Sequence, residues 1–165
     1  MGLDMYLTKE YWLSGYKTNL EEITFHYPYA NGKDKIIRFN KPIDKIVFEV
    51  AYWRKANQIH KWFVDNVQNG TDDCSHYWVD REKLVTLLNL CKQVKALQSE
   101  NLSQDELEEQ INTLLPTQSG FFFGDTQYDD WYFSQIQDTI DKLEAEIESE
   151  DFQNQEAQYY YQSSW

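Results

Sequence analysis

The spacing of apolar residues changes near residue 54, and this change limits the possible folds more than any other feature of the chain. Residues 1–53 are mostly of β type, and Leu3, Met5 and Leu7 alternate with more polar neighbours as in a half-buried strand. Beyond residue 55, apolar residues recur at three- and four-residue intervals, which is typical of amphipathic helices. Strands followed by helices in one chain of this length predict a single α+β domain spanning residues 1–165.

Four β-type segments are expected. Besides the first, residues 23–29 and 35–39 flank Asn31-Gly32, a strong turn signal, and so predict a hairpin. Residues 45–53 form a longer run that we expect to be a central strand. The aromatic tail, residues 159–165, is expected to dock on this sheet as an added edge strand. We therefore predict a small, mainly antiparallel sheet from the N-terminal third, extended by the C-terminal tail.

About four helices are expected to pack on this sheet, with a short extended segment at residues 76–79 and a polar loop at 148–158. The second helix has a clear apolar stripe that includes Cys91, which we interpret as a core residue. The signals that delimit the helices are the Asn69-Gly70 stop after residues 56–67, the N-cap Asp80, the capping box of Ser103 and Glu106, the stop at Pro116, and the acidic pair Asp129-Asp130.

The net charge of −13 is concentrated in one part of the chain. From residue 101 onward there are 15 acidic side chains and one basic side chain, Lys142. Such a field repels nucleic acid and attracts basic protein surfaces, so we expect no direct nucleic-acid binding. The chain lacks an apolar run of about 18 residues, a secretory signal and a cysteine framework, which predicts an intracellular protein without a membrane contact.

The junction between strand and helix carries an electrostatic conflict. Arg54, Lys55 and Asn57 are expected in the first turn of a helix, where the dipole disfavours cations unless an anion joins them. This pattern favours an anion site, and the alternative is a pair of long side chains that reach into water or contact the acidic region. His60 lies beside the apolar face, which is typical of a buried, hydrogen-bonded histidine and less often of a ligand or catalyst.

The segment from Leu114 to Gly124 is too elaborate for an ordinary connection between helices. Thr117, Gln118, Ser119 and Gly120 offer hydroxyls, an amide and backbone N–H groups suited to a phosphate or a base edge. The segment is neither a P-loop nor a nucleophile elbow. The alternative is a tight turn in which the three phenylalanines 121–123 form core and edge contacts.

Aromatic residues near this segment and in the tail provide flat surfaces on which a base could stack, although aromatic residues more often build a core. We predict no catalytic residue, no cofactor and no metal ligand; His76 follows Asp72, Asp73 and Cys74 at a spacing that matches no structural zinc site. The predicted ligand-binding residues are Arg54, Lys55, Asn57, His60, Thr117, Gln118, Ser119, Gly120, Tyr128, Trp131 and Trp165.

Several segments resemble a family of uncharacterised proteins encoded by bacteriophages and bacterial genomes. The resemblance implies a viral or prophage origin and a cytoplasmic location in a bacterial host cell, and it implies no activity or site residues. Its motifs are MGLDMYL at residues 1–7, YWRKAN at 52–57, IHKWFV at 59–64, LLPTQSGFFFG at 114–124, YD at 128–129 and YYQSSW at 160–165.

Three functions follow as hypotheses. The first is a phage accessory protein that counters host defence by sequestering a small anionic, nucleotide-type ligand without turnover. The second is an acidic inhibitor in which residues 138–151 mimic nucleic acid and block a basic host defence protein. The third is a hydrolase or nucleotide-modifying enzyme that uses His60. A homo-oligomer in which a second copy covers the aromatic segment is a further expectation.

Overall fold

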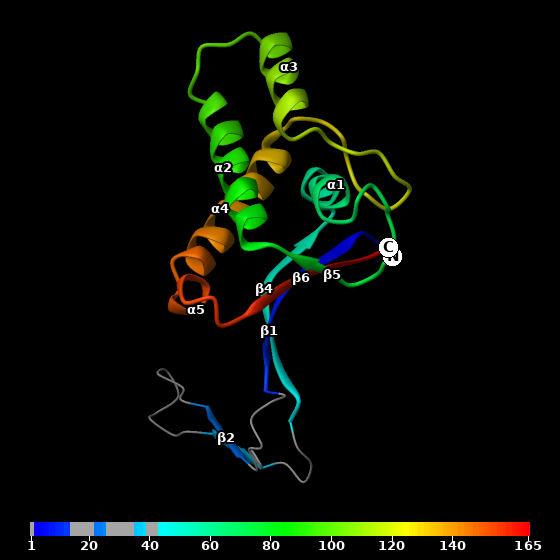
Figure 1. The fold of residues 1–165 in the computed structure, drawn as a ribbon. Helices are drawn as coiled ribbons and strands as arrows, with labels where there is room; N and C mark the ends of the chain where they lie inside the picture. The colour runs from blue at the N-terminus through cyan, green and yellow to red at the C-terminus, as the bar shows by residue number, and fades with distance from the viewer. Residues whose placement is uncertain (1, 14–21, 26–34, 39–42) are drawn as a thin grey trace.

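The computed structural model describes residues 2–13, 22–25, 35–38 and 43–165, and its architecture is the predicted α+β type (Figure 1). One antiparallel sheet has the strand order β4-β1-β6-β5. Its strands are β1 (Asp4–Trp12), β4 (Lys45–Arg54), β5 (Tyr77–Val79) and β6 (Gln158–Ser164). A separate two-stranded antiparallel sheet holds β2 (Glu22–Phe25) and β3 (Lys35–Arg38), which confirms the hairpin pairing, while its Asn31-Gly32 turn lies outside the described residues.

The second, third and fourth helices start where the sequence predicts, but the first starts only at Asn57. Arg54 is the last residue of β4 and Lys55 lies in the turn after it, so the expectation that both lie in the first turn of a helix is wrong. Asp80 caps α2 by accepting a hydrogen bond from the backbone N–H of Glu82, and Ser103 forms a complete capping box with Glu106. The predicted polar loop at 148–158 is wrong in part, because Ser149 caps a short helix there. The helices are α1 (Asn57–Asn66), α2 (Arg81–Leu97), α3 (Gln104–Leu114), α4 (Asp130–Ile147) and α5 (Glu150–Gln153).

The core lies between the sheet and the helices. Met5 and Leu7 of β1 are buried on the helical side, whereas Tyr6 and Thr8 alternate with them on the opposite face and are only half-buried. The apolar stripe of α2 is buried along its length, and burial raises the pKa of the Cys91 thiol to about 12, as expected of a core residue.

The order of the strands corrects two expectations. The C-terminal tail is not an edge strand, because β6 lies between β1 and β5. The long run at residues 45–54 is not central, because β4 pairs within this sheet with β1 alone and forms its edge. Burial explains why β6, and not β4, is a central strand. Tyr159 and Tyr161 of β6 are almost fully buried, while Val47 and Phe48 of β4 are more than 40% exposed.

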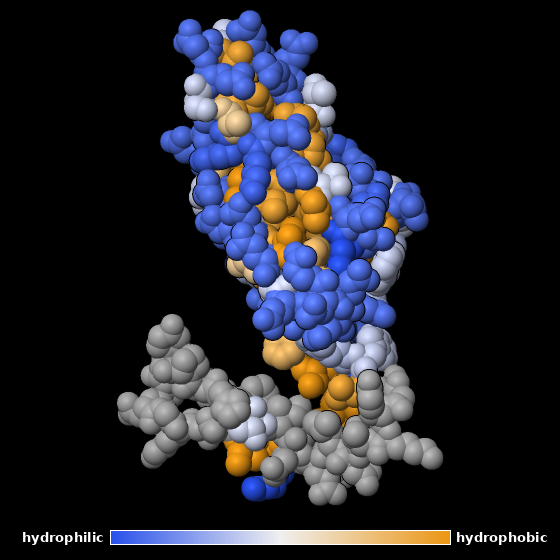
Figure 2. All heavy atoms as spheres, turned by 60° about the vertical axis from the view of Figure 1, so that its left-hand side comes forward, coloured by the Kyte–Doolittle hydropathy of each residue, from blue (hydrophilic) through white to orange (hydrophobic). Residues whose placement is uncertain are grey.

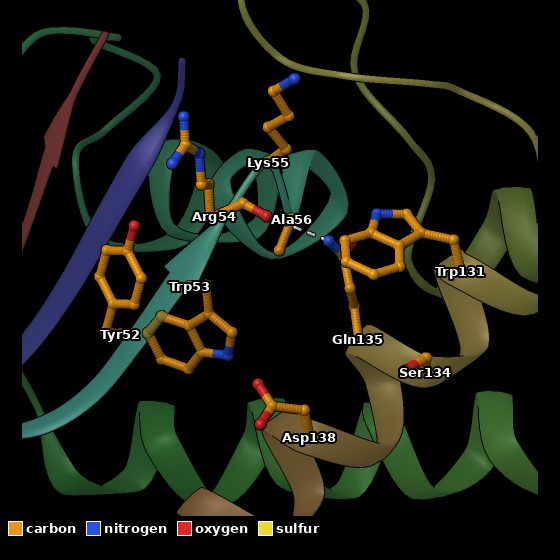
Figure 3. Close-up of a pocket in the computed structure, with 9 residues that line it drawn as sticks. All are labelled: Tyr52, Trp53, Arg54, Lys55, Ala56, Trp131, Ser134, Gln135 and Asp138. Carbon is orange, nitrogen blue, oxygen red and sulfur yellow. Dashed lines mark hydrogen bonds between the residues drawn. The ribbon is translucent and has the colours of Figure 1, made fainter. Parts of the chain in front are cut away.

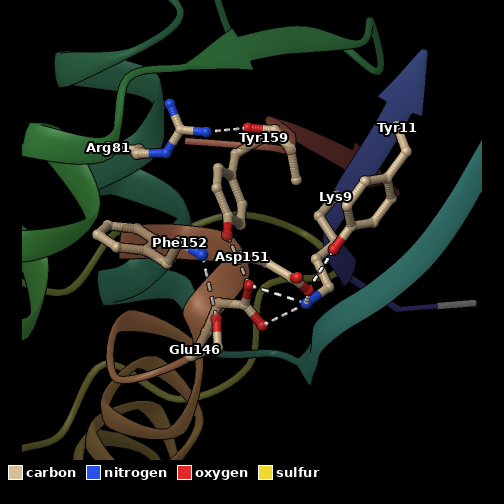
Figure 4. A network of polar contacts seen from close by, with 9 residues as sticks. Lys9, Tyr11, Arg81, Glu146, Asp151, Phe152 and Tyr159 are labelled. Carbon is tan, nitrogen blue, oxygen red and sulfur yellow. Dashed lines mark hydrogen bonds and ion pairs between the residues drawn. The ribbon is translucent and has the colours of Figure 1, made fainter. Parts of the chain in front are cut away.

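A network of charges fixes α5 and the end of α4 to β1 (Figure 4). The Lys9 ammonium lies 3.1 Å from Glu146 and 3.0 Å from Asp151. The Tyr159 hydroxyl donates to Glu146, and the Tyr11 hydroxyl donates to Asp151. Burial alone would lower the pKa of Lys9, but its hydrogen bonds to both carboxylates raise that pKa above its ordinary value. The hydrogen bonds from Tyr11 and Lys9 lower the pKa of Asp151. The acidic C-terminal segment is thus partly neutralised inside the molecule.

Hydrophilic residues cover most of the molecular face shown in Figure 2, with apolar residues showing between them. Val85 of α2 is among the exposed apolar side chains of the described residues. No helix in the described part of the chain is both long enough and apolar enough to cross a bilayer.

Neighbouring tyrosines of β6 test the assigned faces of the sheet. Tyr161 is fully buried and stacks on Phe63 with ring centroids 3.9 Å apart, whereas Tyr160 points to the other face and stacks on His76. We expect Tyr161→Ala to lower the free energy of unfolding by about 3–5 kcal/mol, as for other buried aromatic residues. Tyr160→Ala should cost about 1 kcal/mol. Chemical denaturation of both variants measures the difference, and equal losses would contradict the register of β6.

Candidate functional site

The turn between β4 and α1 has an unusual backbone. Lys55 adopts a positive φ of 57°, a left-handed conformation that costs a residue with a side chain about 1 kcal/mol or more. Its N–H donates to the carbonyl of Leu3 at 2.8 Å, which holds the turn in place. Gly124 packs against it, since a Cβ at Gly124 would lie 3.1 Å from that of Lys55. The structure thus fixes where the Lys55 side chain leaves the backbone.

A pocket of about 450 Å³ opens beside this turn, between the end of β4 and one face of α4 (Figure 3). We call it the junction pocket. Arg54 and Lys55 lie at one end in Figure 3, Asp138 lies at the other, and the indoles of Trp53 and Trp131 lie between them. The lining residues are Tyr52, Trp53, Arg54, Lys55, Ala56, Trp131, Ser134, Gln135 and Asp138.

Positive charge at the junction pocket is incompletely balanced. The Arg54 side chain is 60% exposed, and its Nε lies 3.9 Å from Asp4. Lys55 is exposed and forms no ion pair with any residue that the structure describes. Helix α1 has neither a side-chain cap nor an acidic residue in its first turn, so its positive dipole end adds to the two cations. An anion is the natural partner for this arrangement.

Hydrogen bonds connect the α4 side of the pocket to β4 and α1. Gln135 is buried, donates to the carbonyl of Arg54 at 3.2 Å and accepts from Gln58 at 3.1 Å. Trp131 is 59% exposed, so its ring is accessible to a ligand. Residues 131, 134, 135 and 138 share one face of α4 because they follow a helical spacing. Sequence reasoning missed Ser134, Gln135 and Asp138, although this spacing from Trp131 was a usable signal.

Asn57, His60 and Gln118 form an interior network instead of lining the pocket. The Asn57 amide donates to the carbonyls of Phe123 and Asp125 at 3.1 and 2.7 Å, and its oxygen accepts from the N–H of Gln118 at 3.0 Å. These bonds hold residues 118–125 against the first turn of α1. Since the same residues include Gly124 beside Lys55, the network positions the turn that carries the two cations.

His60 is completely buried and has a partner at each ring nitrogen. Its Nδ1 lies 2.7 Å from the Tyr161 hydroxyl, and its Nε2 lies 3.0 Å from Asp72, which also accepts from the Gln118 side chain at 3.4 Å. Burial lowers the pKa of His60, and Asp72 offsets only part of this effect. These contacts link α1, β6 and the polar turn at Asp72 within the interior.

The remaining predicted residues of the aromatic segment lie outside the pocket. Thr117 donates to the carbonyl of Thr126 at 3.1 Å, while Ser119 and Gly120 are exposed. Gly120 is required by packing, because a Cβ there would lie 2.6 Å from the ring of Phe123.

The alternative interpretation of this segment, in which all three phenylalanines form core and edge contacts, holds for Phe122 and Phe123, but Phe121 is not part of the core. Phe123 is buried and Phe122 is half-buried, whereas Phe121 is 94% exposed.

Two further predicted aromatic residues, Tyr128 and Trp165, pack against aromatic rings of the protein itself. Tyr128 packs edge-on against Tyr132, and Trp165 packs edge-on against Phe123 with ring centroids 6.1 Å apart. Of the eleven predicted residues, the junction pocket brings together Arg54, Lys55 and Trp131. Comparisons of the chain with known protein families, with curated proteins and with solved structures found no match.

Protonation of His60 should make stability depend on pH. Because its pKa is lowered in the folded state, the unfolded chain binds the proton more readily below about pH 6.5. The free energy of unfolding should therefore fall as the pH drops from 7.5 to 5.5, by at most about 1.4 kcal/mol per pH unit from this residue. Denaturation curves across this range should show a smaller slope for His60→Gln. An unchanged slope would argue against His60 as the source.

The stability of the protein should depend on the side-chain amide of Asn57. Asn57→Asp replaces the amide that donates to two carbonyls with a carboxylate that repels them, so we expect a loss of about 3 kcal/mol and faster chymotryptic cleavage near Phe121. Asn66→Asp is the matched control, because the only hydrogen bond of the Asn66 amide to a described residue goes to the carbonyl of Trp62 within α1. Denaturation and limited proteolysis measure both effects, and a similar loss in the two variants would contradict the positioning role.

Proposed function

We propose that the protein binds a small anionic ligand of nucleotide type in the junction pocket and holds it without turnover. The observation that carries this proposal is the Lys55 ammonium, which has no ion pair among the described residues and stands beside Arg54 at the uncapped start of α1. A phosphate group would satisfy both cations and the dipole of α1 together.

The rest of the pocket suits a ligand with a flat part. The exposed ring of Trp131 offers a stacking surface, and aromatic stacking contributes about 1–3 kcal/mol per base. The volume of about 450 Å³ lies within the usual range for small-molecule sites. Ser134 and Gln135 add polar groups on one wall, as expected of a site that orients its ligand.

Binding without turnover fits the chemistry of the lining. Among the residues that the structure describes, the side chains that line the pocket include no histidine or cysteine that could activate Ser134. His60, on which the hydrolase hypothesis depends, is fully buried, and both of its ring nitrogens have hydrogen-bond partners inside the protein. The geometry therefore favours sequestration over the enzymatic hypothesis.

The acidic-inhibitor hypothesis receives less support from the geometry. Glu146 and Asp151 bind Lys9 inside the molecule, and Glu144 pairs with Lys92. These carboxylates are thus less available to a basic partner than the sequence suggests. In the phage setting implied by the sequence resemblance, a nucleotide-binding protein of this kind would counter host defence by removing a nucleotide signal from the cytoplasm.

Native mass spectrometry and calorimetry test the proposal. Protein purified from its expression host should release a nucleotide-sized mass on mild denaturation, and the emptied protein should bind phosphate-bearing nucleotides or pyrophosphate. Arg54→Ala and Lys55→Ala should each weaken binding at least tenfold, because a hydrogen bond to a charged group contributes about 1.5–3 kcal/mol.

Lys83→Ala is the matched control, since it removes one exposed cation from α2, remote from the pocket lining. Its affinity should equal that of the parent protein. Failure of the emptied protein to bind any nucleotide or pyrophosphate would refute the proposal. An equal loss of affinity in Arg54→Ala, Lys55→Ala and Lys83→Ala would also refute it.

A further inference from the structure

The two ends of the junction pocket differ in the polar groups that they present. Arg54 and Lys55 lie at one end and the Asp138 carboxylate lies at the other (Figure 3). An anionic group of a ligand is therefore attracted to the first end, whereas at the second end Lys142 offsets the charge of Asp138 and the carboxylate serves as a hydrogen-bond acceptor. The end at Asp138 requires groups that donate hydrogen bonds, because an ionised carboxylate only accepts them.

Asp138 is held in position by Lys142. The Lys142 ammonium donates to Asp138 Oδ2 at 2.6 Å and to the carbonyl of Tyr52 at 2.6 Å, and it lies 5.7 Å from the centre of the Trp53 ring. The other oxygen, Oδ1, has no hydrogen-bond partner among the described residues. An ionised carboxylate has about four acceptor positions, so both oxygens remain able to accept from a ligand.

The bases differ in what they present to a carboxylate. Guanine carries two parallel N–H donors, at N1 and at the N2 amine, which match the two oxygens of one carboxylate. Adenine and cytosine place a ring acceptor beside their single amine, and that acceptor would face the carboxylate unfavourably. Uracil offers one N–H between two carbonyls. A carboxylate at this end therefore selects guanine over the other common bases.

We propose that the ligand of the junction pocket is a guanine nucleotide. Its phosphate contacts Arg54 and Lys55, its base lies along Trp131, and its N1 and N2 donors bind Asp138. This assignment rests on the proposed function, because it names the ligand of the same pocket.

Calorimetry with guanosine, inosine, adenosine and xanthosine monophosphates tests the assignment on the emptied protein. Guanosine monophosphate should bind at least tenfold more tightly than inosine monophosphate, which lacks the N2 amine, and more tightly still than adenosine monophosphate. Asp138→Asn should weaken the binding of guanosine monophosphate at least tenfold. The same variant should favour xanthosine monophosphate, because an amide can donate to the oxygen at C2 while accepting from N1–H.

Asp141→Asn is the matched control, since it removes the same charge from α4 at an exposed position that does not line the pocket. It should leave the order of affinities unchanged. Equal affinity for the four nucleotides would overturn this inference, as would a guanine preference that persists in Asp138→Asn. The proposed function would still hold in either case if binding depended on Arg54. Absence of binding by all four nucleotides and by pyrophosphate would overturn both.

Discussion

The contact between Tyr161 and helix α1 is the interaction on which the rest of the structure depends. The ring of Tyr161 stacks on Phe63 with an interplanar angle of 8°, and its hydroxyl lies 2.7 Å from His60. Both partners belong to α1, while Tyr161 belongs to β6, which pairs with β1 and β5. This contact ties the last strand of the chain to the helix that follows β4, and so closes the core.

The position of the junction pocket follows from this anchored helix. Asn57, one turn before His60, holds residues 118–125 through three hydrogen bonds, and Gly124 in turn packs on Lys55. The strained backbone of Lys55 is therefore supported on both sides, by Leu3 and by Gly124. The interior network does not contact the pocket through its own side chains. It sets the direction in which the two cations leave the chain.

Local signals in the sequence predicted the elements well, and long-range contacts were predicted poorly. Asp80 and Ser103 were identified as caps because the partners of a cap lie within a few residues. The exchange of places between β4 and β6 could not be predicted, since alternation along a strand indicates a buried face without naming the neighbouring strand. Arg54 and Lys55 were singled out because they were expected in the first turn of a helix; both line the pocket, but Arg54 ends β4 and Lys55 precedes α1. Tyr128 and Trp165 were assigned to ligand stacking, but Tyr132, one helical turn away, packs against Tyr128, and Phe123, distant in the sequence, packs against Trp165.

Binding of an anion by the two cations is the central claim, and NMR of the backbone amides tests it at the level of residues. Titration of the isotope-labelled protein with pyrophosphate should shift the N–H signals of Lys55 and Asn57, which flank the start of α1. The indole N–H of Trp78 serves as the reference, because Trp78 is exposed on the face of the sheet opposite the core. Saturable shifts confined to the junction would support the account. An unchanged spectrum, or shifts as large at Trp78 as at Lys55, would contradict it.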